Sequence, residues 1–223
     1  MCWKAITDWA VAGGTLVLAA VAVFQETIRS WFYRPQFKVT TSTEPPHCVS
    51  VPVTDNVGTF LGDRVYLRVW VENTGNAAAK NVEVYASELR YLRADHKWER
   101  IKSFPSMNLK WADIGFLFWP LIAPKVGKHC DVVHITDPAK RLRLGEDAPR
   151  LLLDPKTSNM VFDLITAPNH KSHIVGPGEY QLDIIVSAEN ALPHRATLQI
   201  ALDGRWDVNE TIMLRDHAGI RLV

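Results

Sequence analysis

The residues best suited to chemistry are two His-Cys dipeptides, His47-Cys48 and His129-Cys130, with His134 close behind the second. Imidazole nitrogens and thiolate sulfurs are preferred zinc ligands, so His129, Cys130 and His134 raise the hypothesis of a metal-dependent hydrolase. Neighbouring residues of a strand point to opposite faces, however, so each dipeptide can readily offer only one ligand. The pattern therefore favours buried thiols and surface histidines over a metal site.

Other catalytic patterns are missing from the sequence. We find no serine-hydrolase, zinc-protease, phosphate-loop or dinucleotide-binding motif, and no C-x-x-C pair. Asp131, His134 and Asp137 lie close together without a neighbouring nucleophile, and His170-x-x-His173 falls in an expected loop. We therefore predict no catalytic residue, no metal and no cofactor.

Composition and charge restrict the function further. The 223 residues include 25 Lys and Arg against 24 Asp and Glu, which gives a net charge of +1. Nucleic-acid binding normally requires a basic face that neutralises phosphates, and we do not expect it here. Three cysteines are too few for a disulfide scaffold, although a Cys48–Cys130 disulfide could form in an oxidising compartment.

The opening segment, residues 1–35, is the most distinctive part of the chain. Residues 9–24 contain no charge and are apolar all round, unlike a helix that lies on a soluble core. A helix over residues 9–31 would extend about 33 Å, close to the roughly 30 Å of bilayer hydrocarbon. We therefore expect a transmembrane anchor that contacts the bilayer through residues 9–33. Its apolar body and its aromatic and basic ends are formed by Trp9, Leu16, Leu18, Phe24, Arg29, Trp31, Tyr33 and Arg34.

Two alternatives for this segment stay open, a cleaved signal peptide with a small-residue site at residues 20–22, and a buried soluble helix. More basic residues follow the segment than precede it, which predicts a single-pass protein of a bacterial inner membrane with its C-terminal domain in the cytoplasm. Small residues four apart, Ala10 with Gly14 and Thr15 with Ala19, would allow a homo-oligomer through the anchor helix.

The remaining chain, residues 36–223, has the alternation of β-strands. In residues 65–72 the odd positions are apolar and form one face, and a turn at residues 73–76 leads into residues 82–86 with the same period. We expect these two strands to be antiparallel. Short alternating runs follow without a long amphipathic helix between them, which predicts an all-β antiparallel sandwich.

Two strings carry a resemblance to a known family. YLRVWVENTGNAAAKNVEVY, followed about a hundred residues later by GPGEYQLDIIVSAEN, resembles Ig-like sandwich modules of the CARDB type. In these modules a strand ending in V-x-N-x-G turns into a strand of the form A-x-N-V-x-V. The resemblance implies an Ig-like β-sandwich that binds or spaces without catalysis. Residues 94–160 exceed the roughly 100 residues of an Ig-like core and are expected to be an insertion.

Residues 176–180, GPGEY, are similar to the tyrosine corner of Ig-like domains, in which a Tyr hydroxyl ties a loop back to the backbone. We therefore expect a structural role for Tyr180.

The uncharged run IGFLFWPLIAP, residues 114–124, is too short to span a membrane and contains two prolines. Two interpretations stay open: it covers an edge of the sandwich, or it is an exposed patch for lipid or a partner. The patch would consist of Trp111, Phe116, Phe118 and Trp119.

These observations favour a membrane-anchored, non-enzymatic interaction or scaffolding module with an unknown protein partner. The rival hypothesis is an exported, membrane-tethered, ligand-binding sandwich with a Cys48–Cys130 disulfide.

Overall fold

In the computed structural model the described residues are 3–112, 116–146, 154 and 156–223, and within the first helix the side chains of residue 7 and residues 9–25. The chain divides into two compact units, Met1–Arg34 and Pro35–Val223. The first unit is helical and the second, which we call the body, is built from strands.

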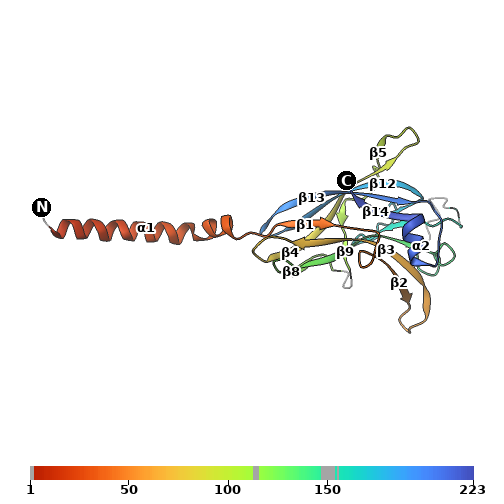
Figure 1. Ribbon diagram of the computed structural model, residues 1–223, viewed down its shortest axis with the longest axis horizontal. Coiled ribbons are helices and arrows are strands. Elements are labelled where there is room, and N and C mark those ends of the chain that lie inside the picture. The colour runs from red at the N-terminus through yellow and green to blue at the C-terminus, as the bar shows by residue number, and fades with distance from the viewer. Residues whose placement is uncertain (1–2, 113–115, 147–153, 155) are drawn as a thin grey trace. The chain divides into compact units, whose positions relative to one another are not determined.

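Helix α1 spans Trp3–Phe32 (Figure 1). The described anchor side chains Trp9, Leu16, Leu18 and Phe24 are all exposed, between 56% and 80%. Tyr33 and Arg34, which follow the helix, are exposed as well. The side chains of Arg29 and Trp31 lie outside the described residues. Among the residues described, no helix combines the length and apolarity needed to cross a membrane.

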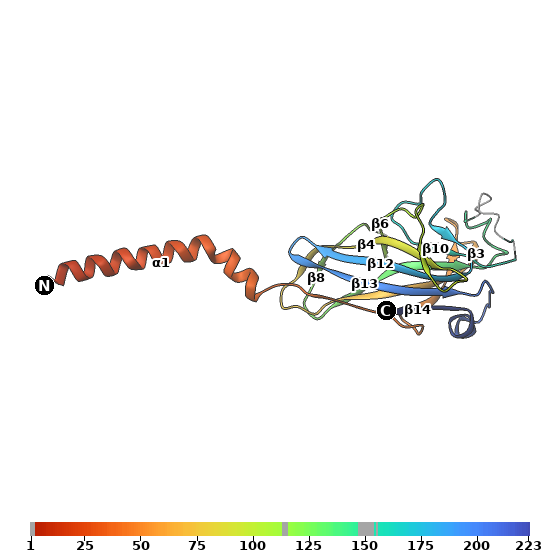
Figure 2. The ribbon, with the colours of Figure 1, turned by 90° about the horizontal axis from the view of Figure 1, so that it is seen from above.

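The body is an all-β sandwich of two antiparallel sheets, which confirms the predicted class (Figures 1 and 2). In the first sheet β3 pairs with β9; β1 and β2 share the other edge of β3, and β7 and β10 share the other edge of β9, with β11 beyond β10. Its strands are β1 (Phe37–Thr40), β2 (Cys48–Thr54), β3 (Phe60–Asn73), β7 (Lys110–Trp111), β9 (Gly127–Thr136), β10 (Met160–Phe162) and β11 (Ile174–Val175).

The second sheet has the order β14-β13-β12-β4, and β5, β6 and β8 share the remaining edge of β4. Its strands are β4 (Ala79–Leu92), β5 (Trp98–Arg100), β6 (Met107–Asn108), β8 (Trp119–Ile122), β12 (Gly178–Ala188), β13 (Ala191–Leu202) and β14 (Ala218–Leu222). A short helix α2 (Glu210–Ile212) and a π-helical turn (Met213–His217) precede β14.

The core lies between the sheets and follows the period of two in the sequence. On β3, Val65, Leu67, Val69 and Val71 are at most 1% exposed. Their even-numbered neighbours face away from the core and are half-buried. The predicted tyrosine corner is also present, because the Tyr180 hydroxyl donates to the carbonyl oxygen of Gly176 at 3.1 Å.

The expected pairing between the strand at residues 65–72 and the strand at residues 82–86 is wrong. β3 pairs with β1, β2 and β9, whereas β4 pairs with β5, β6, β8 and β12, so the two strands lie in opposite sheets. Buried Asn73 organises the arch between them, since its side-chain nitrogen donates to the carbonyls of Ala77 and Ile122 at 2.7 and 3.0 Å. These bonds replace those that a tight hairpin would make.

The segment 94–160, expected to be an insertion, contains a central strand of the sandwich. β9 lies between β3 and the pair β7 and β10, and eight of its ten residues are buried. The segment also supplies β5, β6 and β8, which complete the edge of the second sheet along β4. The residues that exceed an Ig-like core are therefore distributed around both sheets.

Candidate functional site

Charged side chains gather on the outward face of the first sheet, away from the core. On β3, Arg64, Tyr66 and Arg68 alternate with the core residues, so all three point to this face. Their partners across β9 are Thr136, His134 and Asp131, respectively. Residues directly opposite each other on paired strands project to the same side, so these six side chains form one surface.

A β-bulge in β9 makes this surface possible. Leu67 pairs with Val133 and Arg68 pairs with Asp131, so Val132 has no partner on β3. In a regular strand, residues three apart such as Asp131 and His134 would point to opposite faces. The extra residue shifts the alternation, as bulges often do at functional sites, and brings both side chains to the outward face.

His134 is held between two carboxylates. Its Nδ1 lies 3.0 and 2.9 Å from the two oxygens of Asp163, just after β10, and its Nε2 lies 3.1 Å from Oε1 of Glu146. Glu146 also accepts from the Thr136 hydroxyl at 2.5 Å and forms an ion pair with Arg64. His134, Glu146 and Asp163 are each at most 6% exposed.

This arrangement determines the charge of the imidazole. Burial alone would lower the pKa of His134, but Asp163 and Glu146 outweigh it and raise the pKa from 6.5 to about 9. For Glu146, burial acts to raise the pKa, yet His134, Thr136 and Arg64 together lower it to about 2. At neutral pH the group is therefore an imidazolium between two carboxylates.

A second ion pair flanks this group. Arg68 Nε donates to Oδ1 of Asp131 at 2.6 Å, and its guanidinium carbon lies 5.1 Å from the centre of the Tyr66 ring. Burial, with the nearby Asp163 charge, raises the pKa of Asp131 to about 6 despite the arginine. We call Arg64, Arg68, Asp131, His134, Glu146 and Asp163 the ionic cluster.

The geometry of the ionic cluster limits its chemistry. Both ring nitrogens of His134 are engaged as donors to carboxylates, so the imidazolium has no lone pair for a proton or a metal ion. The Thr136 hydroxyl donates to Glu146, whose pKa of about 2 makes this carboxylate too weak a base to activate the hydroxyl as a nucleophile. The arrangement is suited to holding charge in place and to binding, not to proton transfer.

The ionic cluster borders a cavity of about 430 Å³. Beyond the cluster, this cavity is lined by two lysines, Lys110 of β7 and Lys171, by His173 before β11, and by apolar residues including Val161 and Ile174. We call it the charged cavity.

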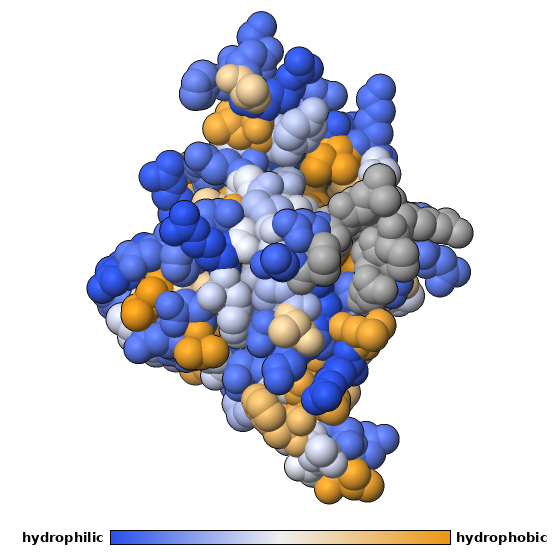
Figure 3. Space-filling view, turned by 90° about the vertical axis from the view of Figure 1, so that its right-hand side faces the viewer, coloured by the Kyte–Doolittle hydropathy of each residue, from blue (hydrophilic) through white to orange (hydrophobic). Residues whose placement is uncertain are grey.

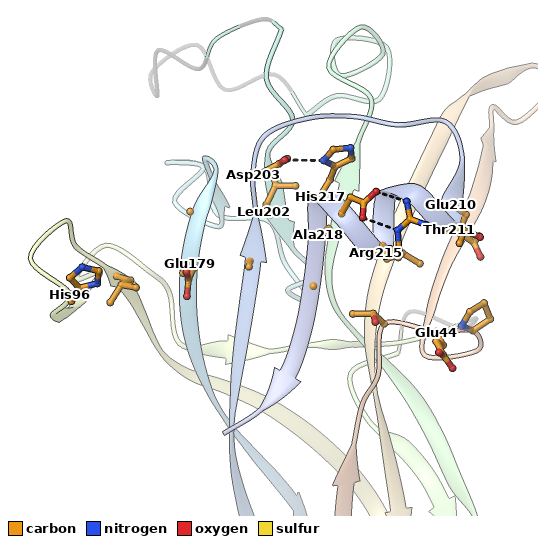
Figure 4. A pocket seen from close by; sticks show the side chains of 18 of the residues that line it. Glu44, His96, Glu179, Leu202, Asp203, Glu210, Thr211, Arg215, His217 and Ala218 are labelled. Atoms are coloured by element: carbon orange, nitrogen blue, oxygen red, sulfur yellow. Dashed lines mark hydrogen bonds and ion pairs between the residues drawn. The ribbon is translucent and has the colours of Figure 1, made fainter.

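A larger and more open depression, about 980 Å³, lies over the β12, β13 and β14 side of the second sheet (Figure 4). Glu179, Ala201 and Gly219 are cross-strand neighbours and form its floor. Because Ala201 and Gly219 have almost no side chain, the surface is low there. Figure 4 shows the walls: Glu44 from the segment between β1 and β2, Glu210 from α2, and the hairpin carrying His96. We call this depression the trough.

The trough is acidic. Its lining carries five carboxylates against two arginines, and the arginines form ion pairs with Glu99 and Asp216. The carboxylates belong to Glu44, Glu179, Asp203, Glu210 and Asp216.

One acid of the trough is paired with a histidine. The Asp203 carboxylate lies 2.9 Å from His217 Nδ1 and accepts from the Arg205 amide at 2.8 Å, and these contacts outweigh burial and lower the pKa of Asp203.

Within each His-Cys dipeptide, the histidine and the cysteine point to opposite faces of the first sheet, as the strand period predicts. Cys48 and Cys130 are fully buried free thiols. The His47 and His129 rings lie 5.3 Å apart, and His129 contacts the Trp70 ring at 4.7 Å. Among the described residues, no three or more His, Cys, Asp or Glu side chains are placed to share a metal ion.

The hypothesised Cys48–Cys130 disulfide is absent because β3 separates the two residues. Cys48 pairs with Leu67 on one edge of β3, and Cys130 pairs with Val69 on the other. Two strand spacings of about 4.8 Å put the Cα atoms more than about 9 Å apart, beyond the reach of a disulfide. Each thiol instead donates to a carbonyl, that of Ser42 or Lys110.

The expected partner patch is divided by the fold. Trp111 is 1% exposed and donates its indole N–H to the Val82 carbonyl, so it is not available to a partner. Trp119 is half-buried and starts β8, which covers the edge of β4. Phe116 and Phe118 are exposed, 57% and 40%, while residues 114 and 115 of the run lie outside the described part.

Several residues of the ionic cluster could not be found from the sequence. The sequence does indicate Arg64 and Arg68, since they alternate with apolar residues on a strand of high β-propensity. No sequence pattern indicates Glu146 and Asp163, because they come from segments 12 and 29 residues beyond His134 in the chain. Asp137, weighed beside His134, instead caps a turn by accepting from the Ala139 amide at 2.9 Å.

No family model matches the chain, and no curated protein matches it.

Proposed function

We propose that this protein is a non-enzymatic binding module, held at a bilayer by α1, whose β-sandwich receives a basic segment of a protein partner in the trough. The acidic lining of the trough is the observation that carries the proposal. The proposal includes an Ig-like, CARDB-type relationship of the body. The tyrosine corner at Tyr180 and the polar arch at Asn73 support that relationship.

Charge complementarity favours a basic partner. The trough carries five carboxylates against two arginines, and the small residues Ala201 and Gly219 leave room on its floor for a Lys- or Arg-rich segment. The face shown in Figure 3 is mainly hydrophilic, with hydrophobic residues in small separate groups, so it does not present one large apolar docking patch.

Attachment to a bilayer is supported by the exposed apolar side chains of α1. Trp9, Leu16, Leu18 and Phe24 would be exposed to water if the helix were free in solution. At about 25 cal/mol per Å² of apolar surface, transfer of several such side chains into lipid stabilises the bound state by several kcal/mol. In this proposal the basic residues after the helix keep the body on the cytoplasmic side.

The trough is tested with a defined probe. The full chain in detergent micelles is titrated with a fluorescent Lys- and Arg-rich peptide and, separately, with an acidic peptide of equal length. We expect the basic peptide alone to bind, and the double variant Glu44→Lys, Glu179→Lys to weaken it by roughly tenfold or more. The matched control, Glu72→Lys with Glu189→Lys, changes the net charge equally outside the trough and should bind like the wild type. If both double variants lose affinity for the basic peptide equally, the binding depends on overall charge rather than on the trough, and the proposal is refuted.

The bilayer attachment is tested by alkaline extraction of membranes that contain the full chain. Leu16→Asp with Leu18→Asp should release the protein, while Leu142→Asp with Leu192→Asp, at two exposed leucines of the body, should not. Reporters active only in the cytoplasm or only after export, fused to Val223, then give the side of the membrane. Full release of the wild-type chain, or an export signal, would contradict this part of the proposal.

A further inference from the structure

The charged cavity contains more positive charge than its own acids neutralise. Each acid of the ionic cluster already has a cationic partner: Asp131 has Arg68, Glu146 has Arg64, and Asp163 has His134. Lys110 and Lys171 also line the cavity, and neither forms an ion pair within the described part of the chain. Within the described residues, two ammonium groups therefore line the cavity without an ion-pair partner.

Arg68 adds donors to the same space. Its Nε is used by Asp131, and among the interactions of the described residues its two terminal nitrogens have no partner. A guanidinium presents such nitrogens as a planar fork that matches a carboxylate or a phosphate. The strand registers place Arg68, Asp131 and Lys110 side by side, because Arg68 and Lys110 are the neighbours of Asp131 on either side of β9.

His173 provides an unsatisfied polar group in the cavity wall. The residue is 5% exposed, and its Nδ1 has no hydrogen-bond partner in the described structure. Burial, with the nearby charges of Lys171, His134 and Lys110, lowers the pKa of His173 to about 4, so the ring is neutral at pH 7. Buried polar atoms without a partner are rare, and they commonly mark the place of a water, an ion or a ligand.

One wall of the cavity is apolar. Val161 of β10 and Ile174 of β11 are cross-strand neighbours and form a small hydrophobic cluster separate from the core. Both line the cavity beside the charged groups. A binding site that combines a few polar anchors with an apolar wall is typical for small organic molecules.

We propose that the charged cavity binds a small organic anion. Its carboxylate or phosphate group is received by Arg68, Lys110 and Lys171, and His173 provides a further hydrogen bond. Its short apolar part lies against Val161 and Ile174. A volume of about 430 Å³ accommodates a metabolite-sized molecule but not a polymer. This site is separate from the trough and does not depend on the proposed partner.

The test is calorimetric titration of the full chain in detergent micelles with inorganic phosphate, butyrate and succinate, and with acetate as a shorter reference for butyrate. We expect at least one of the two carboxylate probes to bind in the millimolar range or better, and butyrate to bind more tightly than acetate because of the apolar wall. The double variant Lys110→Gln, Lys171→Gln should lower the affinity roughly tenfold or more. The matched control, Lys97→Gln with Lys156→Gln, removes the same charge from exposed positions and should stay within about twofold of the wild type.

A measurement on the wild-type chain keeps the test independent of how well the variants fold. The bound probe should protect Lys110 and Lys171 from acetylation, but not Lys97 or Lys156, as read by mass spectrometry of peptides. The pKa of His173, followed by NMR, should rise when the probe binds because an anion offsets the neighbouring ammonium groups. Absence of binding by all probes, equal loss in both double variants, or protection without selectivity would each overturn the proposal.

Discussion

Replacement of His134 by Gln should remove a part of the stability that depends on pH. Gln keeps a polar side chain of similar length between Asp163 and Glu146 but carries no charge. In the wild-type protein these two carboxylates hold the pKa of His134 at about 9, against 6.5 for an ordinary histidine. The folded state therefore binds a proton more tightly than the unfolded state does.

The magnitude follows from the shift in pKa. A shift from 6.5 to about 9, at about 1.4 kcal/mol per unit, corresponds to about 3 kcal/mol of folding free energy as an order of magnitude. Because the folded pKa is raised, this stabilisation is fully present below pH 6.5 and disappears as the pH rises through 9. The difference in unfolding free energy between wild type and His134→Gln should accordingly shrink by about 3 kcal/mol between pH 6.5 and pH 10.

This pH range separates His134 from the other shifted groups of the cavity. Burial raises the pKa of Tyr66 above its usual value of 10, so its ionisation lies above the range. Asp131, with its pKa raised to about 6, and His173, with its pKa lowered to about 4, both act below pH 6.5. Glu146, with its pKa lowered to about 2, acts below 4.5. Any packing loss caused by Gln is the same at every pH and cancels in the comparison.

The assay is urea unfolding of the full chain in detergent micelles, followed by tryptophan fluorescence at several pH values between 6.5 and 10. The control is His170→Gln, an exposed histidine, whose difference from the wild type should be independent of pH. If the His134→Gln difference changes by less than about 0.5 kcal/mol over this range, the carboxylates do not hold the imidazolium as the structure indicates, and the reasoning is refuted.

Three further predictions concern the body. Tyr180→Phe removes the hydrogen bond to the carbonyl four residues upstream and should lower the unfolding free energy by about 1 kcal/mol in urea titrations. Gly127→Ala would place a methyl group 2.3 Å from the Trp70 ring, and should lower the midpoint of thermal unfolding by several degrees, whereas an unchanged midpoint would mean that the indole moves freely. Cys48 and Cys130 are buried, which raises their thiol pKa values, so a thiol reagent should modify neither in the folded protein and both in urea, as counted by mass spectrometry.

The alternation of apolar residues was sufficient to predict the sandwich and its core. Val65 to Val71 repeat with a period of two, and the structure buries this face, because a strand has only two faces and one must exclude water. The same signal could not assign β3 and β4 to sheets. A short turn after Asn73 is compatible with a hairpin or with an arch between sheets, and the choice depends on side-chain bonds across 49 residues to Ile122.

The ionic cluster shows why a site is harder to predict than a fold. Asp131 and His134 are three apart, a spacing that in a regular strand separates them, and only the bulge at Val132 brings them together. A bulge depends on the register between two strands, and a single sequence does not contain that register. The carboxylates of Glu146 and Asp163 are then added by the tertiary fold.

Stability alone does not account for the charged cavity. A buried ion pair loses the hydration of both partners, and apolar residues of similar volume often stabilise a fold equally well or better. The outward face of the first sheet could have been covered by such residues, as the Val161 and Ile174 pair shows on a small scale. Instead it carries a balanced ionic cluster and, beside it, two lysines that no described acid neutralises. The cluster fixes the positions of the arginines, and the unbalanced charge of the two lysines lines the cavity, which is the arrangement expected of an anion-binding site rather than of a structural ion-pair network.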